Sequence, residues 1–89
     1  MASAVPRPGP AIRLVFLGRL EDAAGVPDRM VPHAPSIDQV LDALDPDLAA
    51  LLRGPRVKLA VNGILLRDTD APLLRDGDEI AFLPPVSGG

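Results

Sequence analysis

The sequence predicts an α+β fold in which a mixed sheet of four or five strands packs on one main helix. Two observations lead to this prediction. Apolar runs with the two-residue period of strands lie near both ends of the chain, and one strongly capped helix signal lies between them. A chain of 89 residues holds one modest core, so we expect a single domain over residues 11–85.

The first strand is expected to begin at Ile12, after a disordered or extended arm at residues 1–10. Three prolines crowd that arm, which has almost nothing apolar to bury. From Ile12, the apolar residues Ile12, Leu14 and Phe16 alternate with residues 13, 15 and 17, as in a strand. Residues 18–25 then fit a short helix that is closed by Gly25.

Residues 29–34 read as a second strand. Pro32 lies inside this run and has no N–H to donate to a neighbouring strand. Such a strand belongs at the edge of a sheet. We therefore expect residues 79–83 to occupy the centre, parallel to the first strand.

The main helix is predicted to start after Ser36. Ser36 and Gln39 have the spacing of a capping box, and an apolar face follows that reaches Leu44. Asp45-Pro46 ends this helix and caps a second short one, which residues 54–55 terminate.

The rest of the chain reads as strands joined by tight turns. Residues 57–61 form a third strand, and Asn62-Gly63 supplies the positive φ angles of a hairpin turn into a short strand at residues 64–67. Asp76-Gly77 turns the chain into the last strand, residues 79–83. Pro84 and Pro85 end it, so the chain is expected to leave the fold there.

Composition excludes several classes of function. The chain has no Cys, hence no disulfide, thiol nucleophile or cysteine metal site. Its net charge is −3, and it has no basic stripe that could bind phosphates. With no Trp, no Tyr and two Phe, it also has few aromatic rings on which bases could stack, so we expect no nucleic acid partner. No apolar run is long enough for a membrane span or a signal core, which predicts a cytoplasmic protein without a membrane partner. His33 is expected to be a surface residue rather than a metal ligand or base, because no second His or Cys completes a site.

Residues 76–89 resemble the closing motif of the molybdopterin synthase small-subunit family, which has the ubiquitin-like β-grasp fold. Val61-Asn62-Gly63 and residues 16–25 also match this family in position, so the resemblance spans residues 12–89. Three positions differ from the common pattern: Leu17 and Leu83 stand where aromatic residues are frequent, and Glu21 where many members have Arg.

The resemblance implies that residues 86–89 form a carrier tail whose Gly89 carboxylate is adenylated and then becomes a thiocarboxylate. The implied partners are the large subunit of the synthase, an ATP-dependent adenylyltransferase similar to ubiquitin-activating enzymes, and a sulfurtransferase or cysteine desulfurase that supplies sulfur. The catalytic groups would belong to the large subunit. We expect no bound cofactor and no metal, with ATP used by the activating enzyme.

The chemistry of the tail agrees with this role. A carboxylate is a poor electrophile and needs activation, yet the chain has no Gly-rich phosphate loop of its own. Gly88 and Gly89 lack Cβ atoms and can enter a narrow channel, and Ser87 precedes them. Six residues reach ~20 Å, and the two prolines keep the first part extended.

Apolar residues near the tail are expected to contact the large subunit. Phe82 and Leu83 point to opposite faces of their strand, so one suits the core and the other a docking patch. The expected partner-binding residues are Leu59, Phe82, Leu83, Pro84, Pro85 and Val86.

Three alternatives stay open. The tail also fits a sulfur carrier for thiamin, cysteine or another metabolite. It fits equally a ubiquitin-type modifier, with Gly89 joined to lysines of other proteins. The third reading is a plain interaction module with an inert tail.

Overall fold

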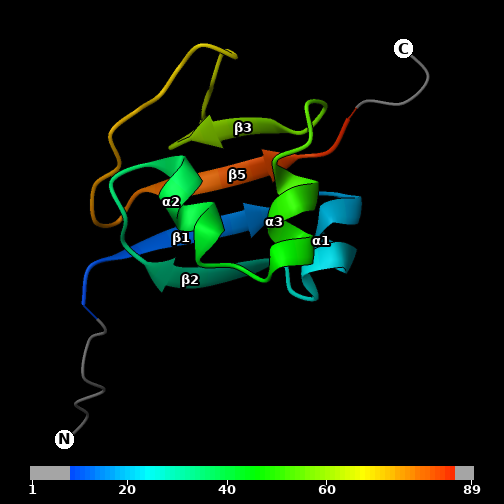
Figure 1. The fold of residues 1–89 in the computed structure, drawn as a ribbon, viewed down its shortest axis with the longest axis horizontal. Coiled ribbons are helices and arrows are strands. Elements are labelled where there is room, and N and C mark those ends of the chain that lie inside the picture. Colours follow the sequence, from blue (N-terminus) through cyan, green and yellow to red (C-terminus); the bar gives the residue numbers. More distant parts are fainter. Residues whose placement is uncertain (1–8, 86–89) are drawn as a thin grey trace, which may run out of the picture.

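The computed structural model describes residues 9–85, which form a five-stranded sheet and three short helices (Figure 1). In chain order the elements are β1 (Ala11–Phe16), α1 (Arg19–Ala24), β2 (Asp28–Pro32), α2 (Ile37–Asp42), α3 (Pro46–Leu52), β3 (Lys58–Val61), β4 (Ile64–Leu65) and β5 (Glu79–Leu83).

The sheet has the order β2-β1-β5-β3-β4, with β5 in the centre. β1 and β5 run parallel, whereas the other neighbouring pairs are antiparallel. β2, which contains Pro32, lies at one edge. The prediction of a mixed sheet with a central last strand and a proline-containing edge strand is therefore confirmed.

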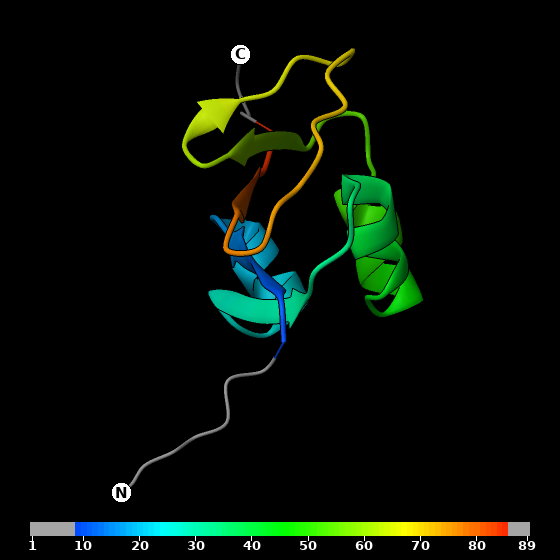
Figure 2. The same cartoon turned by 90° about the vertical axis from the view of Figure 1, so that its left-hand side faces the viewer.

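The core lies between one face of the sheet and the layer formed by α2 and α3 (Figure 2). Alternate residues of β1 and β5 supply its sheet side, because successive side chains of a strand point to opposite faces. The rings of Phe16 and Phe82 stack with centroids 5.7 Å apart, and both side chains are buried. Val40 and Leu52 are the most buried residues of α2 and α3.

The helix boundaries follow the capping signals. The Ser36 hydroxyl accepts a hydrogen bond from the Gln39 N–H at 3.2 Å, and the Asp45 carboxylate accepts from two N–H groups at the start of α3. α2 ends at Asp42, before the predicted Leu44, because Asp45 precedes a proline and adopts an extended ψ of 133°. Leu44 is nevertheless buried in the core.

The β3–β4 hairpin turns at Asn62 and Gly63, whose φ angles are 50° and 84°. β4 covers two residues rather than the predicted four. The Arg67 N–H donates to the Asp70 carboxylate at 2.9 Å, which draws the chain into a turn after Leu66 and away from the ladder.

Asp78 ties the hairpin to the turn that leads into β5. The Asn62 side-chain amide donates to Asp78 at 3.0 Å, and the Arg75 N–H donates to its other carboxylate oxygen at 2.8 Å. The hydrogen bond from Asn62, followed by that from Arg75, lowers the pKa of Asp78 below its usual value. The Asn62 side-chain oxygen in turn accepts from the Glu79 N–H at 2.9 Å.

This arrangement, two hairpin-like units around a helical crossover with parallel first and last strands, is the ubiquitin-like β-grasp fold. Within residues 9–85, none of the helices has the length and apolar character needed to cross a bilayer.

We expect Asp78→Asn to destabilise the protein at neutral pH and to lose that effect in acid. A carboxylate with a lowered folded pKa contributes stability above its unfolded pKa, about 3.9, and this is lost as the pH falls through the folded value. Urea denaturation at about pH 7, 4 and 2.5 measures the difference from the wild type. Asp22→Asn, at an exposed site without a hydrogen bond to the described residues, is the control, and a difference that does not depend on pH contradicts the assignment.

Candidate functional site

The arm that leads to the C-terminus leaves the fold where β1 and β5 end together. Parallel strands deliver their carboxyl ends to the same edge of a sheet, and the Leu17 N–H donates to the Phe82 carbonyl at 3.1 Å at this edge. The chain after β1 then turns into α1, whereas the chain after β5 continues as Pro84 and Pro85 (Figure 1). We call residues 83–85 the arm root.

Gly18 makes room for the arm root. Its φ of 54° and ψ of −134° fall in a region that side chains disfavour. A Cβ added at Gly18 lies 2.9 Å from the Pro84 Cγ, closer than real Cβ contacts allow. Because Gly18 has no side chain, Pro84 can pass close to the end of β1.

Phe82 and Leu83 divide between core and surface as the strand period requires. Phe82 is 0% exposed and Leu83 is half-buried on the opposite face. Phe82 is therefore no longer expected to contact a partner, because its ring is stacked inside the core and has no exposed surface. Leu83 is still expected to do so.

Leu59 lies on a different face from Leu83. It pairs with Phe82 across the β3–β5 ladder, so it faces the helical layer, where it packs against the core. Leu59 also lines a groove between α2 and the segment after β4. A partner that covers Leu83 on the open face does not reach Leu59 at the same time.

The arm root itself is half-buried at Pro84 and Pro85. Val86, Ser87, Gly88 and Gly89 lie outside the described residues. Their predicted roles stay predictions.

The sheet face turned away from α2 and α3 carries an apolar row that the sequence analysis did not identify. The register aligns small and apolar side chains across four strands, namely Val15, Ala81, Ala60 and Leu65. Leu65 is 59% exposed, and α2 and α3 lie on the other side of the sheet (Figure 2). The Asn62-Gly63 turn was the available signal, since a two-residue turn pairs residue 60 with residue 65. We call this row, together with Leu83, the open face.

The charges beside the open face are paired with one another. Arg13 donates to Asp28 at 2.6 Å and to Glu79 at 3.3 Å. Its hydrogen bond to Asp28 is the main reason that the pKa of Arg13 is raised. The open face is thus an apolar surface bordered by the ion pairs of Arg13 and by Lys58, which lies opposite Leu83 in the ladder and 4.0 Å from Asp68.

The described residues supply surfaces more than reactive groups. Residues 9–85 contain no group of three or more His, Cys, Asp or Glu side chains suited to a metal ion. His33, which was expected at the surface, is half-buried, and its Nε2 lies 2.9 Å from the Leu74 carbonyl oxygen. Its hydrogen bond ties β2 to the segment before β5.

Comparison with known sequences identifies a family and two named relatives. Residues 14–89 match the model of the ThiS family. The molybdopterin synthase sulfur carrier subunit of Anopheles gambiae is 32% identical over 88% of this chain and 91% of the relative. That of Chlamydomonas reinhardtii is 28% identical over 88% of this chain and 98% of the relative.

Solved structures share the fold. Small archaeal modifier protein 1 of Methanosarcina acetivorans superposes with a TM-score of 0.74 and 28% identity, over 90% of this chain and 97% of the other. The protein of the same name from Haloferax volcanii gives a TM-score of 0.69 at 24% identity, over 89% of this chain and 99% of the other.

Gly18→Ala should shift the arm root and destabilise the fold. The added Cβ meets Pro84 and the backbone must keep an unfavourable φ, which together cost about 1–3 kcal/mol. Chemical denaturation measures the loss, and amide chemical shifts of Leu17 and Leu83 report the movement. Gly9→Ala is the control, because a Cβ there has no atom within 4 Å. Unchanged shifts at both positions contradict the assigned contact.

Proposed function

The chain belongs to the ThiS family, and we propose that it is a sulfur carrier whose Gly89 carboxylate becomes a thiocarboxylate. Its similarity to two molybdopterin synthase sulfur carrier subunits, each matched over most of its length, supports this role. In the more specific form of the proposal, the chain is the small subunit of molybdopterin synthase and acts in the cytoplasm.

The observation that carries the proposal is the path of the arm root. β5 is the central strand and Phe82 is locked in the core, so the base of the arm is rigid. Pro84 and Pro85 then prevent further sheet pairing and direct the chain outward. A carrier needs this combination, because a fixed base lets a partner position the distal glycines once the domain has docked.

Activation begins at the Gly89 carboxylate. One carboxylate oxygen attacks the α-phosphorus of ATP in a separate adenylyltransferase, which forms the acyl adenylate and releases pyrophosphate. The terminal sulfur of a persulfide on a sulfurtransferase or cysteine desulfurase then displaces AMP from the acyl carbon, and a thiol cleaves the resulting S–S bond by disulfide exchange, which leaves the thiocarboxylate on Gly89. The sulfur stays covalently bound to the carrier until its transfer.

Transfer takes place in the large subunit. The arm enters its active site, where the thiocarboxylate sulfur bonds to a carbon of a cyclic pyranopterin precursor and water then cleaves the acyl–sulfur bond to return the Gly89 carboxylate. Two such transfers, from two carriers, supply both sulfurs of the dithiolene. Catalytic side chains belong to the large subunit, since the small subunit contributes the reacting sulfur alone.

The open face and the arm root form the contact with the large subunit. A partly exposed apolar surface beside paired charges suits a stable, apolar subunit interface. Leu83, Pro84 and Pro85 extend that surface toward the tail, and Val86 is proposed as a further contact. Leu59, on the other side of the sheet, has no part in it.

Conjugation to proteins is the second candidate function. The similarity to small archaeal modifier protein 1 of Methanosarcina acetivorans, at 28% identity and a TM-score of 0.74, favours it. In that case an amine rather than sulfur displaces AMP from Gly89. A carrier for thiamin, cysteine or another metabolite remains the nearest alternative within sulfur chemistry.

Leu83→Asp should weaken binding to the large subunit while the protein stays folded. The change places a charge in a desolvated interface, which costs on the order of 2–5 kcal/mol of binding free energy. Calorimetry measures the affinity and circular dichroism the fold. Leu73→Asp, at a side chain that is 76% exposed in the long segment before β5, is the matched control. Equal affinity of the two variants speaks against the open face as the docking surface.

Deletion of Gly89 should abolish adenylation and sulfur transfer without loss of stability. The arm is then shorter by one residue, ~3.3–3.6 Å, and its new terminal carboxyl carbon does not reach the active sites of the two partners. Pyrophosphate release and thermal denaturation measure the two effects, with His33→Ala as a variant that should retain adenylation. Full activity of the truncated chain rules out the carrier role.

Intact mass of protein purified from its own host distinguishes the candidate functions. A carrier shows the exchange of one oxygen for one sulfur. A modifier shows the added mass of a conjugated protein, and an unchanged mass in cells that make molybdenum cofactor counts against both.

A further inference from the structure

A groove of about 320 Å³ lies beside the arm root, between α1, α3 and the segment that joins α3 to β3. Its apolar wall is formed by Leu20, Leu51 and Val57, and Pro85 closes it on the side of the arm. Arg19 and Arg56 also line it. We call this site the arginine groove.

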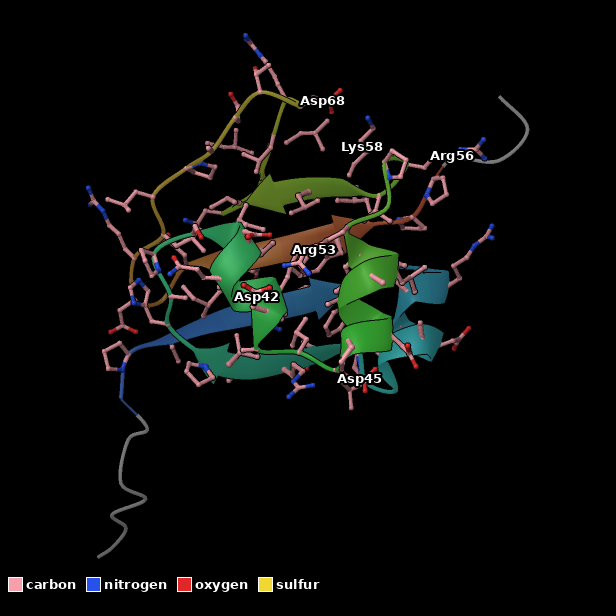
Figure 3. All side chains as sticks on the ribbon, viewed as in Figure 1. Asp42, Asp45, Arg53, Arg56, Lys58 and Asp68 are labelled. Carbon is pink, nitrogen blue, oxygen red and sulfur yellow. The ribbon has the colours of Figure 1, made fainter. Side chains whose placement is uncertain are left out.

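Arg19 and Arg56 have no acidic partner among the described residues, as also holds for Arg29, Arg67 and Arg75, and the groove is distinguished by bringing two such arginines to one site. Arg13 is held by Asp28 and Glu79, as described above. Arg53 donates to Asp38 at 2.9 Å and to Asp42 at 2.8 Å, and these hydrogen bonds raise its pKa. In Figure 3 the Arg53 side chain lies close to Asp42, whereas Arg56 lies near the arm root. Within residues 9–85, no ion pair involves Arg19 or Arg56, and both are exposed.

Unpaired cations on an acidic protein are informative about a partner. The net charge of the chain is −3, so the protein as a whole repels acidic surfaces. The two positive charges at the groove attract such surfaces locally. Leu51 is 44% exposed and leaves apolar surface in the same groove as the two arginines. Such a site fits a segment that carries carboxylates close to an apolar side chain.

We propose that the arginine groove docks an acidic segment of the activating enzyme, with an apolar side chain of that segment against Leu51 and Val57. The inference rests on the proposed function, which requires an enzyme that adenylates Gly89. Pro85 lines the groove, so a segment bound there lies next to the arm that the enzyme must receive.

The groove suits the activating enzyme better than the large subunit. The carrier must leave its activating enzyme after each cycle, and transient interfaces are smaller and more polar than stable subunit contacts. Opposite charges speed association without a large buried apolar area. The open face has its charges paired and offers apolar surface, whereas the groove offers unpaired charge. Leu83 and Pro85, two residues apart, border the two surfaces, so each partner meets the arm at its base.

Charge reversal of both arginines tests the proposal. For the variant Arg19→Glu/Arg56→Glu, we expect the KM for adenylation by the activating enzyme of the same organism to rise roughly tenfold, with kcat unchanged. The KM of the wild type should rise between ionic strengths of about 0.01 and 0.15 M, and that of the variant should not. Affinity for the large subunit should stay the same.

Further variants separate the contributions. Arg29→Glu reverses the charge of one unpaired arginine at an exposed position of β2, two strands from β5, and should leave the KM near that of the wild type, whereas Arg19→Glu and Arg56→Glu should each raise it when introduced singly. Leu51→Asp tests the apolar part and should also raise the KM. Circular dichroism confirms that each variant is folded.

Each remaining outcome overturns the inference in a distinguishable way. An unchanged KM of the folded double variant shows that the groove is not a docking site for this enzyme. Equal losses of adenylation and large-subunit affinity show that the groove belongs to the subunit interface instead. If the wild type is not adenylated at all, the proposed function fails and the inference fails with it.

Discussion

Parallel pairing of β1 with β5 places the ends of two strands that are distant in sequence at the same edge of the sheet. Four residue pairs join these strands, and the stacked rings of Phe16 and Phe82 hold them against the helical layer. Once this pair has formed, the turn at Gly18 and the arm root must lie side by side. The position of the arm root is thus a consequence of the central pairing, and local sequence around the prolines explains only why the strand ends.

The same constraint separates the surface of the protein into parts with different physical character. On one side of the arm root lies the open face, apolar and with its neighbouring charges paired. On the other lies the arginine groove, where two guanidinium groups have no acidic partner among residues 9–85. A protein that carries a group between enzymes needs to bind more than one partner through the same arm. Two unlike surfaces at the base of that arm allow each partner to be recognised by different interactions.

Local signals in the sequence were sufficient for most of the fold. Ser36, Asp45 and the Asn62-Gly63 turn act through hydrogen bonds and backbone angles within a few residues, and each lies where it was expected. Pro32 correctly indicated an edge strand, because the missing N–H is a property of one residue. The length of β4 was predicted wrongly, since the hydrogen bond between Arg67 and Asp70 competes with the ladder.

The candidate site was harder to predict because its surfaces combine distant segments. Alternation showed that one of Phe82 and Leu83 is core, yet only the packing of β5 against the helices shows that it is Phe82. The arginine groove joins α1, the segment after α3 and Pro85, and no spacing in the sequence relates Arg19 to Arg56. The contact between Gly18 and Pro84 likewise depends on the parallel register.

In the proposed role, the chain carries sulfur on its C-terminus and contributes no other reactive group. A single-turnover reaction tests it most directly, with chemically thiocarboxylated protein, the large subunit and the pyranopterin precursor in the absence of any other sulfur source. We expect dithiolene product together with conversion of two Gly89 thiocarboxylates to carboxylates for each dithiolene formed. Loss of the sulfur without dithiolene product, or retention of the sulfur by the carrier, would contradict it.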